Sequence, residues 1–431
     1  MRPLVSHFIA LLIVLSSSGC LANLSEDEVN PLGDADLDRD GIPDEIDNDQ
    51  DGDGWVNSQE YECGNDPRSN SSTPQDKDSD GLCDALDADL EGLLEEYRSF
   101  RDLEQRTADT EWYGYNVTTW QMDNGGWGKN NINGYMEPWD GIEPISPYTC
   151  GKSDCPNGTY LGTLDNNATT SEIRFLSKLY STSSNETNRT IFKNSASQGL
   201  DFILKSQYES GGWPQVYPER IGTYSNLVTF NDHAMIRAML LIWDIIEYKE
   251  PFSTGIFSGL NRTILEDSLD RGLDFILKSQ IRDEGGTLTV WCQQHDPISY
   301  EPMPGRAYEL PSKSGWESVG VTALLLNWPD RTEVVENATW SAVGWFHENM
   351  VVGKEYNMKP NGTFTEKEGS MMWYRFYNLS DDQFFMAGRD SVKVYSISDL
   401  TFEMKTNYQW AGNWGADLVL ETSKLNLTRF T

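Results

Sequence analysis

Three runs of acidic residues near the N-terminus have the spacing of calcium-binding loops. In the middle run, Asp49, Asp51 and Asp53 alternate with other residues, and Glu60 stands at the twelfth position. Calcium takes hard oxygen ligands at loop positions 1, 3, 5 and 12, and a glycine at position 6 makes the turn. The flanking runs repeat the pattern, with expected ligands Asp36, Asp38, Asp40, Asp47, Asp76, Asp78, Asp80 and Asp87. These runs predict a segment that folds around Ca²⁺; a disordered acidic tether is the alternative.

A second group of chemically capable side chains lies in residues 291–320. Four prolines exclude a helix through the middle of this stretch, so we expect a long ordered loop, which is a common carrier of function. His295 and Asp296 could form an acid–base pair, but a structural role in a hydrogen-bonded loop is favoured. Ser314 followed by Glu317 predicts a capping box that opens a helix.

Negative charge is concentrated in the first quarter of the chain. The 431 residues include 33 basic and 68 acidic side chains, for a net charge of −35. Residues 21–110 hold 28 acidic and 6 basic side chains, a net of −22. Such a surface repels nucleic acid and attracts cations. We expect an acidic calcium-binding stalk over residues 21–90, a linking helix over 91–110, and a monomeric domain over 111–431 with a large core.

Residues 1–20 have the features of an export signal. Arg2 precedes an apolar run over residues 4–15, which is too short to cross a bilayer. The run ends in Ser-Ser-Gly-Cys, which resembles a lipoprotein processing box with Cys20 as the lipidated residue. A cleaved soluble signal is the alternative. We therefore expect a secreted protein that is held at the cell surface by a lipid anchor.

The remaining cysteines suit an exported protein. Cys63 and Cys83 share the acidic segment and can pair, and Cys150 and Cys155 bracket a short loop and can also pair. One further cysteine is then left as a buried thiol. Twelve Asn-X-Ser/Thr sequons, Asn116 among them, fit a glycosylated extracellular surface.

A repeat with a period of 73 residues organises the large domain. The sequence GLDFILKSQ occurs over residues 199–207 and again over 272–280, and its apolar residues fall on one helical stripe. Glycine pairs follow both copies. Further helical patterns cover residues 172–180, 234–248, 264–280 and 319–326. Repeated helix pairs with glycine turns predict a mainly α fold, an (α/α) toroid or incomplete barrel with long ordered loops around a groove. A plain helical bundle is the alternative.

Aromatic side chains are frequent in the polar turns. The chain has 15 Trp, 19 Tyr and 16 Phe, and Trp213 and Tyr217 follow directly after one glycine pair. Because a sugar ring stacks well on an aromatic face, we expect Trp213 and Tyr217 to bind a carbohydrate. Packing in the core or in loops is the alternative for each of them.

Eight segments of the large domain occur in a fixed order between residues 124 and 395. They are NGGWGKN, TLDNNAT, GGWPQVYP, TFNDHAM, TVWCQQHDP, GRAYELPSKSG, RFYNL and GRDSVKVY. Together they resemble the signature blocks of polysaccharide lyase family 10 pectate lyases. The resemblance implies a toroid that cleaves polygalacturonate by Ca²⁺-assisted β-elimination. Two positions depart from the pattern: Gly128 stands where a proline is expected, and His233 where a second Asp is expected.

The resemblance also implies the metal ligands. β-Elimination removes the C5 proton of a uronate, which is acidic enough only when the neighbouring carboxylate is neutralised. Asp165 and Asp232 are the expected ligands of the Ca²⁺ that contributes to this. The alternatives are a turn residue for Asp165 and a helix N-cap for Asp232.

Three arginines, Arg306, Arg375 and Arg389, match positions that face the substrate in the family. Arg306 and Arg375 are expected to bind substrate carboxylates, and Lys129 is a further candidate for this role. Arg389 is expected to be the base that takes the C5 proton, although an arginine ordinarily stays protonated. The alternative is that Arg389 only neutralises a carboxylate.

Two other classes of function stay open from the residues alone. An inverting glycoside hydrolase would use two carboxylates, such as Asp165 and Asp232. A non-catalytic, calcium-dependent sugar-binding protein would need only the acidic stalk and a groove. The arginine-rich loops favour a uronate substrate and hence the lyase.

Overall fold

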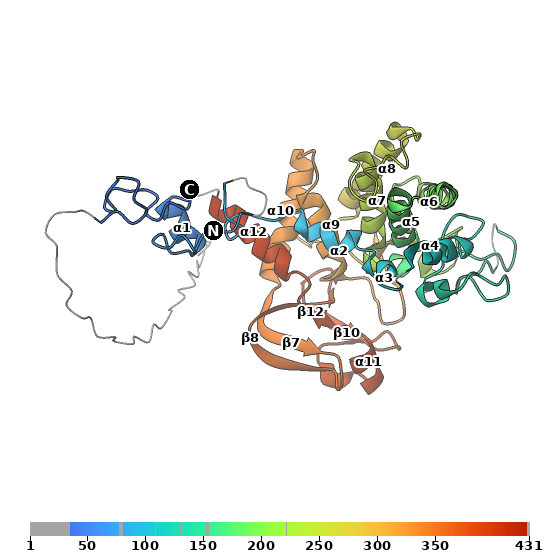
Figure 1. The fold of residues 1–431 in the computed structure, drawn as a ribbon. Coiled ribbons are helices and arrows are strands. Elements are labelled where there is room, and N and C mark those ends of the chain that lie inside the picture. Colours follow the sequence, from blue (N-terminus) through green and yellow to red (C-terminus); the bar gives the residue numbers. More distant parts are fainter. Residues whose placement is uncertain are drawn as a thin grey trace. The chain divides into compact units, whose positions relative to one another are not determined.

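The structure is a computed structural model that describes residues 35–76, 81–107, 109–129, 131–151, 155–220 and 222–428 (Figure 1). The chain divides into two compact units, Met1–Gln75 and Asp76–Thr431. The third acidic run therefore begins the second unit. The predicted signal and its Cys20 lie outside the described residues, as do Asp78 and Asp80. Within the described part of the chain, no helix has the length and apolar character needed to cross a membrane.

Helices pack in pairs in the second unit. Contacts join α5 to α6, α7 to α8 and α9 to α10, and α4 packs on α5 and α6. Their bounds are α4 Thr110–Thr119, α5 Thr170–Thr182, α6 Glu186–Ser206, α7 Ala234–Ile246, α8 Arg262–Ser279, α9 Glu317–Leu326 and α10 Glu333–Glu348. Both copies of the GLDFILKSQ repeat close a helix of such a pair, at the ends of α6 and α8. The paired arrangement predicted from the repeat is confirmed.

The two members of each pair differ in burial and in how they begin. Helices α7 and α9 are buried on almost all sides, as expected for helices that are apolar around their whole circumference. The second helix of each pair is half-exposed and begins at a side-chain cap: Asn185 caps α6, Asn261 caps α8 and Thr332 caps α10. No side chain caps the buried helices α5 and α7, so their first N–H groups are left for other partners. The first N–H group of α9, that of Glu317, donates to the Ser314 hydroxyl at 3.3 Å.

Buried tryptophans repeat with the helix pairs. Four indole N–H groups each donate to a carbonyl of an earlier helix: Trp127 to Val117, Trp213 to Ile203, Trp291 to Ile276, and Trp373 to Phe346. All four tryptophans are fully buried. The prediction that Trp213 binds substrate is therefore wrong: its ring fills the core, and its N–H fixes the glycine turn to the preceding helix.

Residues 91–110 form three short turns and the start of α4 instead of one linking helix. The turns are η1 (Gly92–Leu94), α2 (Glu95–Arg98) and α3 (Arg101–Glu104), and extended backbone at Ser99 separates the last two. They pack on α9, α7 and α5 in that order, and bury Leu94, Tyr97 and Leu103. One straight helix could not follow three helices in succession, which explains why the chain breaks.

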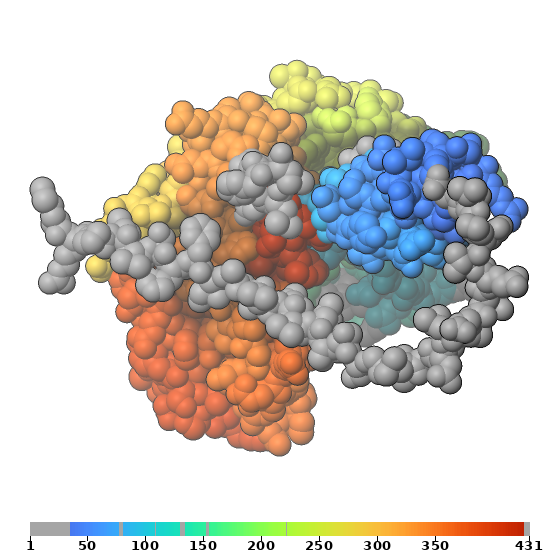
Figure 2. All heavy atoms as spheres, turned by 90° about the vertical axis from the view of Figure 1, so that its left-hand side faces the viewer, coloured from blue at the N-terminus to red at the C-terminus, as the bar shows by residue number. Residues whose placement is uncertain are grey.

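Antiparallel strands that the sequence analysis did not foresee follow the helices. The longest pair is β7 (Val351–Asn357) with β8 (Thr363–Tyr374), which β12 (Ala411–Gly412) extends. A second sheet has the order β11–β10–β9–β6, with bounds Lys393–Val394, Phe384–Ala387, Phe376–Tyr377 and Lys313–Ser314. Residues 351–412 form a lobe beside the helices, orange to red in Figure 2. The lobe has its own apolar cluster, which includes Tyr308 and Tyr408.

Smaller elements complete the second unit. Two short sheets connect the turns before the buried helices, and two helices belong to the C-terminal part. Their bounds are β1 Gly162–Thr163, β2 Val216–Tyr217, β3 Val228–Thr229, β4 Gln294–His295, β5 Pro302–Met303, α11 Phe402–Asn407 and α12 Ala416–Thr428. The predicted loop over 291–320 is thus ordered by three two-residue strands, β4, β5 and β6, before α9 begins.

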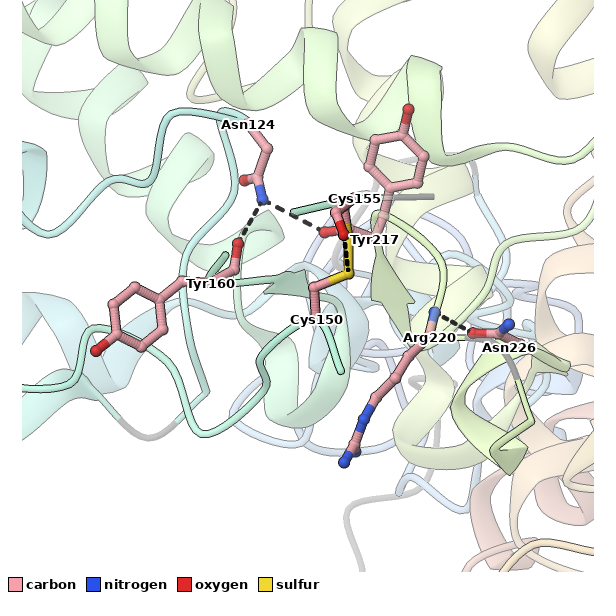
Figure 3. Close-up of a disulfide and its surroundings, with 7 residues drawn as sticks. All are labelled: Asn124, Cys150, Cys155, Tyr160, Tyr217, Arg220 and Asn226. Atoms are coloured by element: carbon pink, nitrogen blue, oxygen red, sulfur yellow. Dashed lines mark hydrogen bonds between the residues drawn. A yellow bond between two sulfur atoms is a disulfide. The ribbon is translucent and has the colours of Figure 1, made fainter. Parts of the chain in front are cut away.

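Four of the described cysteines are disulfide-bonded and one is a free thiol. Cys150 and Cys155 form a disulfide, with Cα atoms 6.2 Å apart, in the loop before β1 (Figure 3). Cys63 and Cys83 are both disulfide-bonded, and Cys292 is a free buried thiol. One sequon does not suit a glycan: Asn116 is fully buried and donates to the carbonyl of Tyr135.

Candidate active site

Tight turns place two acidic residues at the start of buried helices. Asp165 begins η3 (Asp165–Asn167) before α5, and Asp232 lies in η5 (Asn231–His233) before α7. Asn166 and Asp232 have positive φ angles of 51° and 53°. Strained left-handed backbone of this kind clusters at functional sites, and Asn and Asp tolerate it best. Because no side chain caps α5 or α7, the positive ends of both helix dipoles face this region.

The carboxyl groups of Asp165 and Asp232 lie close enough to act on one another's protonation. Burial and the neighbouring Asp165 raise the pKa of Asp232 to about 7. Burial alone would also raise the pKa of Asp165, but the neighbouring Asp232 carboxyl and the ammonium of Lys129 bring it below its ordinary value. Lys129 Nζ lies 2.5 Å from Asp165 Oδ2, and the Tyr148 hydroxyl donates to the same oxygen at 2.9 Å. The structure therefore brings Lys129, Asp165 and Asp232 together.

This pair fits a calcium ion. The two carboxyl groups are mostly buried and close enough that the charge of Asp165 raises the pKa of Asp232, so a cation between them would remove an unfavourable contact. The side chain of Asn166, which follows Asp165 in the sequence, contains a further oxygen, and oxygen is the ligand atom that Ca²⁺ prefers. In this structure Lys129 supplies the compensating positive charge.

Arg375 connects the acidic pair to the C-terminal lobe. Its Nη2 donates to Glu317 Oε1 at 2.6 Å and to Asn231 Oδ1 at 3.3 Å. Its guanidinium lies over the rings of Trp316 and Tyr408, with distances of 4.2 and 4.8 Å to the ring centroids. Arg375 is buried, so the structure gives it a positioning role beside Asp232 and leaves its predicted substrate contact untested.

Arginines and tyrosines alternate from Arg375 outward. Tyr408 lies 5.6 Å from Arg306, and Tyr308 lies between Arg306 and Arg389, at 5.1 and 5.5 Å from their guanidinium carbons. We call this row Arg375–Tyr408–Arg306–Tyr308–Arg389 the arginine ladder. It brings all three predicted arginines into one row that starts beside Asn231.

Each outer arginine of the ladder has a carboxylate partner. Glu309 is buried; it accepts from the backbone and guanidinium of Arg306, and from the Tyr408 hydroxyl at 2.9 Å. Arg389 makes a two-pronged contact with Glu403, at 2.8 and 3.2 Å, and its side chain is 65% exposed. Burial alone would lower the pKa of Arg306. The carboxylate partners outweigh it and hold the pKa of both Arg306 and Arg389 above the ordinary value.

The structure supports the structural interpretation of His295 and Asp296. The His295 ring is fully buried, with Nε2 accepting from the Cys292 N–H at 3.0 Å and Nδ1 2.8 Å from the Tyr300 carbonyl. Burial lowers the pKa of His295 to about 4, which leaves it neutral. Asp296 accepts two backbone N–H groups of the next turn.

Sequence reasoning missed several residues that hold the site. Glu317 was read only as a helix cap, yet its carboxylate joins Arg375, Gln293 and Ser314. Neither Glu309 nor Tyr408 was given a role. The signal for Glu309 was its place three residues after Arg306, which is the spacing of a local ion pair.

Tyr217 lies at the edge of the first short sheet. Its ring is half-buried and meets Phe202 edge-on at 5.7 Å. Asn124 holds this edge by donating to the carbonyls of Tyr160 and Tyr217 (Figure 3). Substrate binding by Tyr217 stays a prediction.

The first two acidic runs of the N-terminal unit contain buried carboxylates. The same unit contains α1 (Asn57–Cys63). Carboxylate oxygens of Asp36, Asp38 and Asp40 lie within 4.8 Å of one another, as do those of Asp49, Asp51 and Asp53. Glu60 is fully buried, and neither of its oxygens has a hydrogen-bond donor among the described residues. Asp47, at the twelfth position of the first run, has one such oxygen. Buried carboxylates without donors are costly, and calcium ligation would satisfy them.

Comparisons with known proteins point to one family of enzymes. A family model described as pectic acid lyase matches residues 121–419. A solved family 10 polysaccharide lyase from Cellvibrio cellulosa, a mutant in complex with trigalacturonic acid, is 32% identical, with a TM-score of 0.66 over 78% of this chain and 98% of that chain. A second structure of family 10 polysaccharide lyase from the same organism is 33% identical, with a TM-score of 0.65 over 76% and 95%. No curated protein matches significantly.

The fold and the site thus define a polysaccharide lyase. More narrowly, the chain belongs to the pectic acid lyase family, whose model covers most of the second unit.

Proposed function

We propose that this chain is a calcium-dependent pectate lyase that cleaves α-1,4-polygalacturonate by β-elimination. One observation carries the proposal: the arginine ladder begins beside an acidic pair that fits Ca²⁺. Cations and a metal site next to one another are what elimination from a uronate requires. The complex of the Cellvibrio enzyme with trigalacturonic acid supports the substrate class. The helix pairs would then form an incomplete (α/α) toroid around the groove.

The arginine ladder suits a polyuronate. Its guanidiniums are planar forks that can bind carboxylates with two parallel hydrogen bonds, and the intervening tyrosine rings hold them apart. Arg306 and Arg389 are the exposed cations of the row, because Arg375 is buried. A galacturonate carboxylate would bind at Arg389, and Arg306 would face the neighbouring residue of the polymer.

The acidic pair provides the metal site of the reaction. Asp165 and Asp232 would hold Ca²⁺, which when bound would neutralise the uronate carboxylate and acidify the C5–H bond. Lys129 lies on Asp165 in this structure and would turn toward a substrate carboxylate. The Asn231 amide N–H donates to Asp232, and its amide oxygen accepts from Arg375. Asn231 would therefore fix the position of the metal site relative to the arginine ladder.

We assign the base to Arg306 instead of Arg389. Arg306 is the first exposed cation along the ladder from Asp232, whereas Arg389 is one tyrosine further out and paired with an exposed glutamate. Glu309 fixes the backbone and the guanidinium of Arg306, and this preorganisation suits a group that must meet the C5 proton. Arg389 then neutralises a neighbouring carboxylate, which was the alternative role considered for it.

The pH dependence should follow the pairing of Arg306 with Glu309. A base works only when deprotonated, so activity should rise toward alkaline pH. Because Glu309 raises the pKa of Arg306, Glu309→Gln should lower that pKa and move the rise of kcat to lower pH. Glu403→Gln, which changes only Arg389, is the matched control and should leave the profile in place. If the pH profile of kcat shifted in Glu403→Gln and not in Glu309→Gln, Arg389 would be the base instead.

A hydrolase built on Asp165 and Asp232 is disfavoured. Inverting glycosidases hold their two carboxylates about 6.5–9.5 Å apart to admit a water, and retaining enzymes about 5–5.5 Å apart. Asp165 and Asp232 act on one another's protonation as close neighbours, which suits a shared cation better than a water held between two separated carboxylates. Product chemistry decides between the two classes, since elimination leaves a C4–C5 double bond and hydrolysis adds water.

We also propose that the N-terminal unit binds calcium through its first two acidic runs. The fully buried Glu60 and the clustered Asp49, Asp51 and Asp53 support this site, and Asp47 supports the site of the first run. The third run, Asp76–Asp87, is proposed on its spacing alone. Calcium would supply the folding free energy that so acidic a segment lacks.

Limited proteolysis of the full chain can test the calcium stalk. With Ca²⁺, residues 35–75 should resist cleavage; with EDTA they should be cut first, because repulsion among unpaired carboxylates unfolds them. Glu60→Gln should raise the Ca²⁺ concentration needed for protection by about tenfold or more, because the bidentate ligand at position 12 is lost. Glu62→Gln, on the same helix but exposed, is the control. Protection that is equal in EDTA would contradict the proposal.

Location and assembly stay proposals of the sequence. We propose that the protein is exported, lipid-anchored through Cys20 at the cell surface, glycosylated at exposed sequons, and monomeric. Loss of the protein from the membrane fraction in a Cys20→Ser variant would support the anchor, and unchanged fractionation would contradict it.

A further inference from the structure

A large cavity extends from the metal site toward the N-terminal turns. It measures about 1300 Å³ and lies between residues 91–104 and the first turns of α5 and α7. Asp232 and Trp316 line it, as does Phe100 from the opposite wall. This volume exceeds that of an ordinary small-molecule pocket and is ample for a sugar ring.

Arg237 is the unusual residue of this cavity. It lines the cavity from α7, one turn after Asp232, and its Nη1 donates to the Tyr97 carbonyl at 2.9 Å. Its Nε is buried without an acceptor. No carboxylate lies within ion-pair distance of Arg237 among the residues that the structure describes, whereas the comparable Arg174 and Arg375 have Asp244 and Glu317 at 2.7 and 2.6 Å.

A mostly buried arginine without a carboxylate partner is a favourable binding site for an anionic ligand. Charged side chains that are mostly buried are almost always paired, because desolvation without a partner is costly. Burial accordingly lowers the pKa of Arg237 to about 10. The same cavity offers the faces of Trp316 and Phe100, and aromatic faces are favourable surfaces for sugar rings.

We propose that this cavity is a distal subsite that binds one hexuronate residue of the polymer, with its carboxylate on Arg237. The proposal rests on the proposed function, because the polymer would reach the cavity past Asp232. It assigns a binding role to the turns α2 and α3, which lie before the residues matched by the family model. Longer substrates would then gain affinity that short ones lack.

Acidic residues that line the cavity should affect how tightly a carboxylate binds at Arg237. Glu95 pairs with Arg98, and Glu104 with Lys178. Glu96 is exposed, and its charge acts on Arg237, as does that of Asp232. A substrate carboxylate at Arg237 would therefore be repelled by Glu96, so Glu96→Gln should strengthen binding while Arg237→Gln weakens it.

Titration calorimetry with tri- and hexagalacturonate tests the subsite. Binding is measured on the full chain in EDTA, where the proposed reaction cannot proceed, and each sample is checked afterwards for cleavage. Arg237→Gln should weaken hexagalacturonate binding about tenfold, the value of one charged hydrogen-bonded contact, and trigalacturonate binding much less. Glu96→Gln should strengthen hexagalacturonate binding, and Arg262→Gln, on the exposed face of α8, should change neither.

Opposite effects of the two cavity variants would not arise from a purely structural role of Arg237. Wild-type affinity in Arg237→Gln, or an equal loss for both oligomers, would overturn the proposal. If that variant does not fold, Glu96→Gln decides: unchanged hexagalacturonate affinity overturns the subsite. The proposed function fails separately, by cleavage in EDTA or by the absence of unsaturated product with Ca²⁺ in the wild type.

Discussion

Arg306→Ala is expected to lower kcat by about 10³-fold while leaving polymer affinity nearly intact, because it removes the base and so an interaction made mainly in the transition state. Arg306→Lys should rescue little, since lysine keeps the charge but loses the planar fork that Glu309 orients. Arg389→Ala should mainly raise KM, as expected for a residue that binds a substrate carboxylate. Steady-state kinetics on polygalacturonate with Ca²⁺ measures all three.

The arginine experiment has a matched control in Arg271→Ala. Arg271 pairs with Asp267 on the outer face of α8, away from the ladder, and its loss should leave both kcat and KM unchanged. If Arg389→Ala abolished turnover and Arg306→Ala only raised KM, the assignment made here would be wrong. Arg389 would then be the base, as the family resemblance first indicated.

Asp232→Ala is expected to raise the Ca²⁺ concentration for half-maximal activity by about tenfold or more, because half of the carboxylate pair is lost. High Ca²⁺ should restore part of the activity, since Arg306 and Arg389 stay in place. Initial rates over a Ca²⁺ series measure this effect. Asp274→Asn, in an exposed ion pair of α8, serves as the control. An unchanged Ca²⁺ requirement in Asp232→Ala would remove Asp232 from the metal site.

The helical framework was largely predictable, because long amphipathic repeats leave a strong pattern. The predicted helices over 172–180, 234–248 and 264–280 match α5, α7 and α8 within a few residues. The shared calcium site of Asp165 and Asp232 was implied by the family resemblance and not by the local pattern, which left a turn residue and a helix cap as alternatives. The structure places the two carboxyl groups close together.

Other features depend on long-range packing that no local pattern records. Trp213 follows two glycines, like an exposed turn residue, yet its indole reaches back to the carbonyl of Ile203. Strands of only two residues, such as β6 and β9, leave almost no signal of alternation. The role of Glu317 depends on Arg375, which is 58 residues away in the sequence.

Ultraviolet absorbance of the products tests the central claim most directly. β-Elimination leaves a C4–C5 double bond conjugated to the carboxylate, which absorbs, whereas hydrolysis leaves none. Wild-type protein with polygalacturonate and Ca²⁺ should build up this absorbance in step with new reducing ends, stop in EDTA, and resume when Ca²⁺ is restored. New reducing ends without absorbance would contradict the lyase assignment and indicate hydrolysis instead.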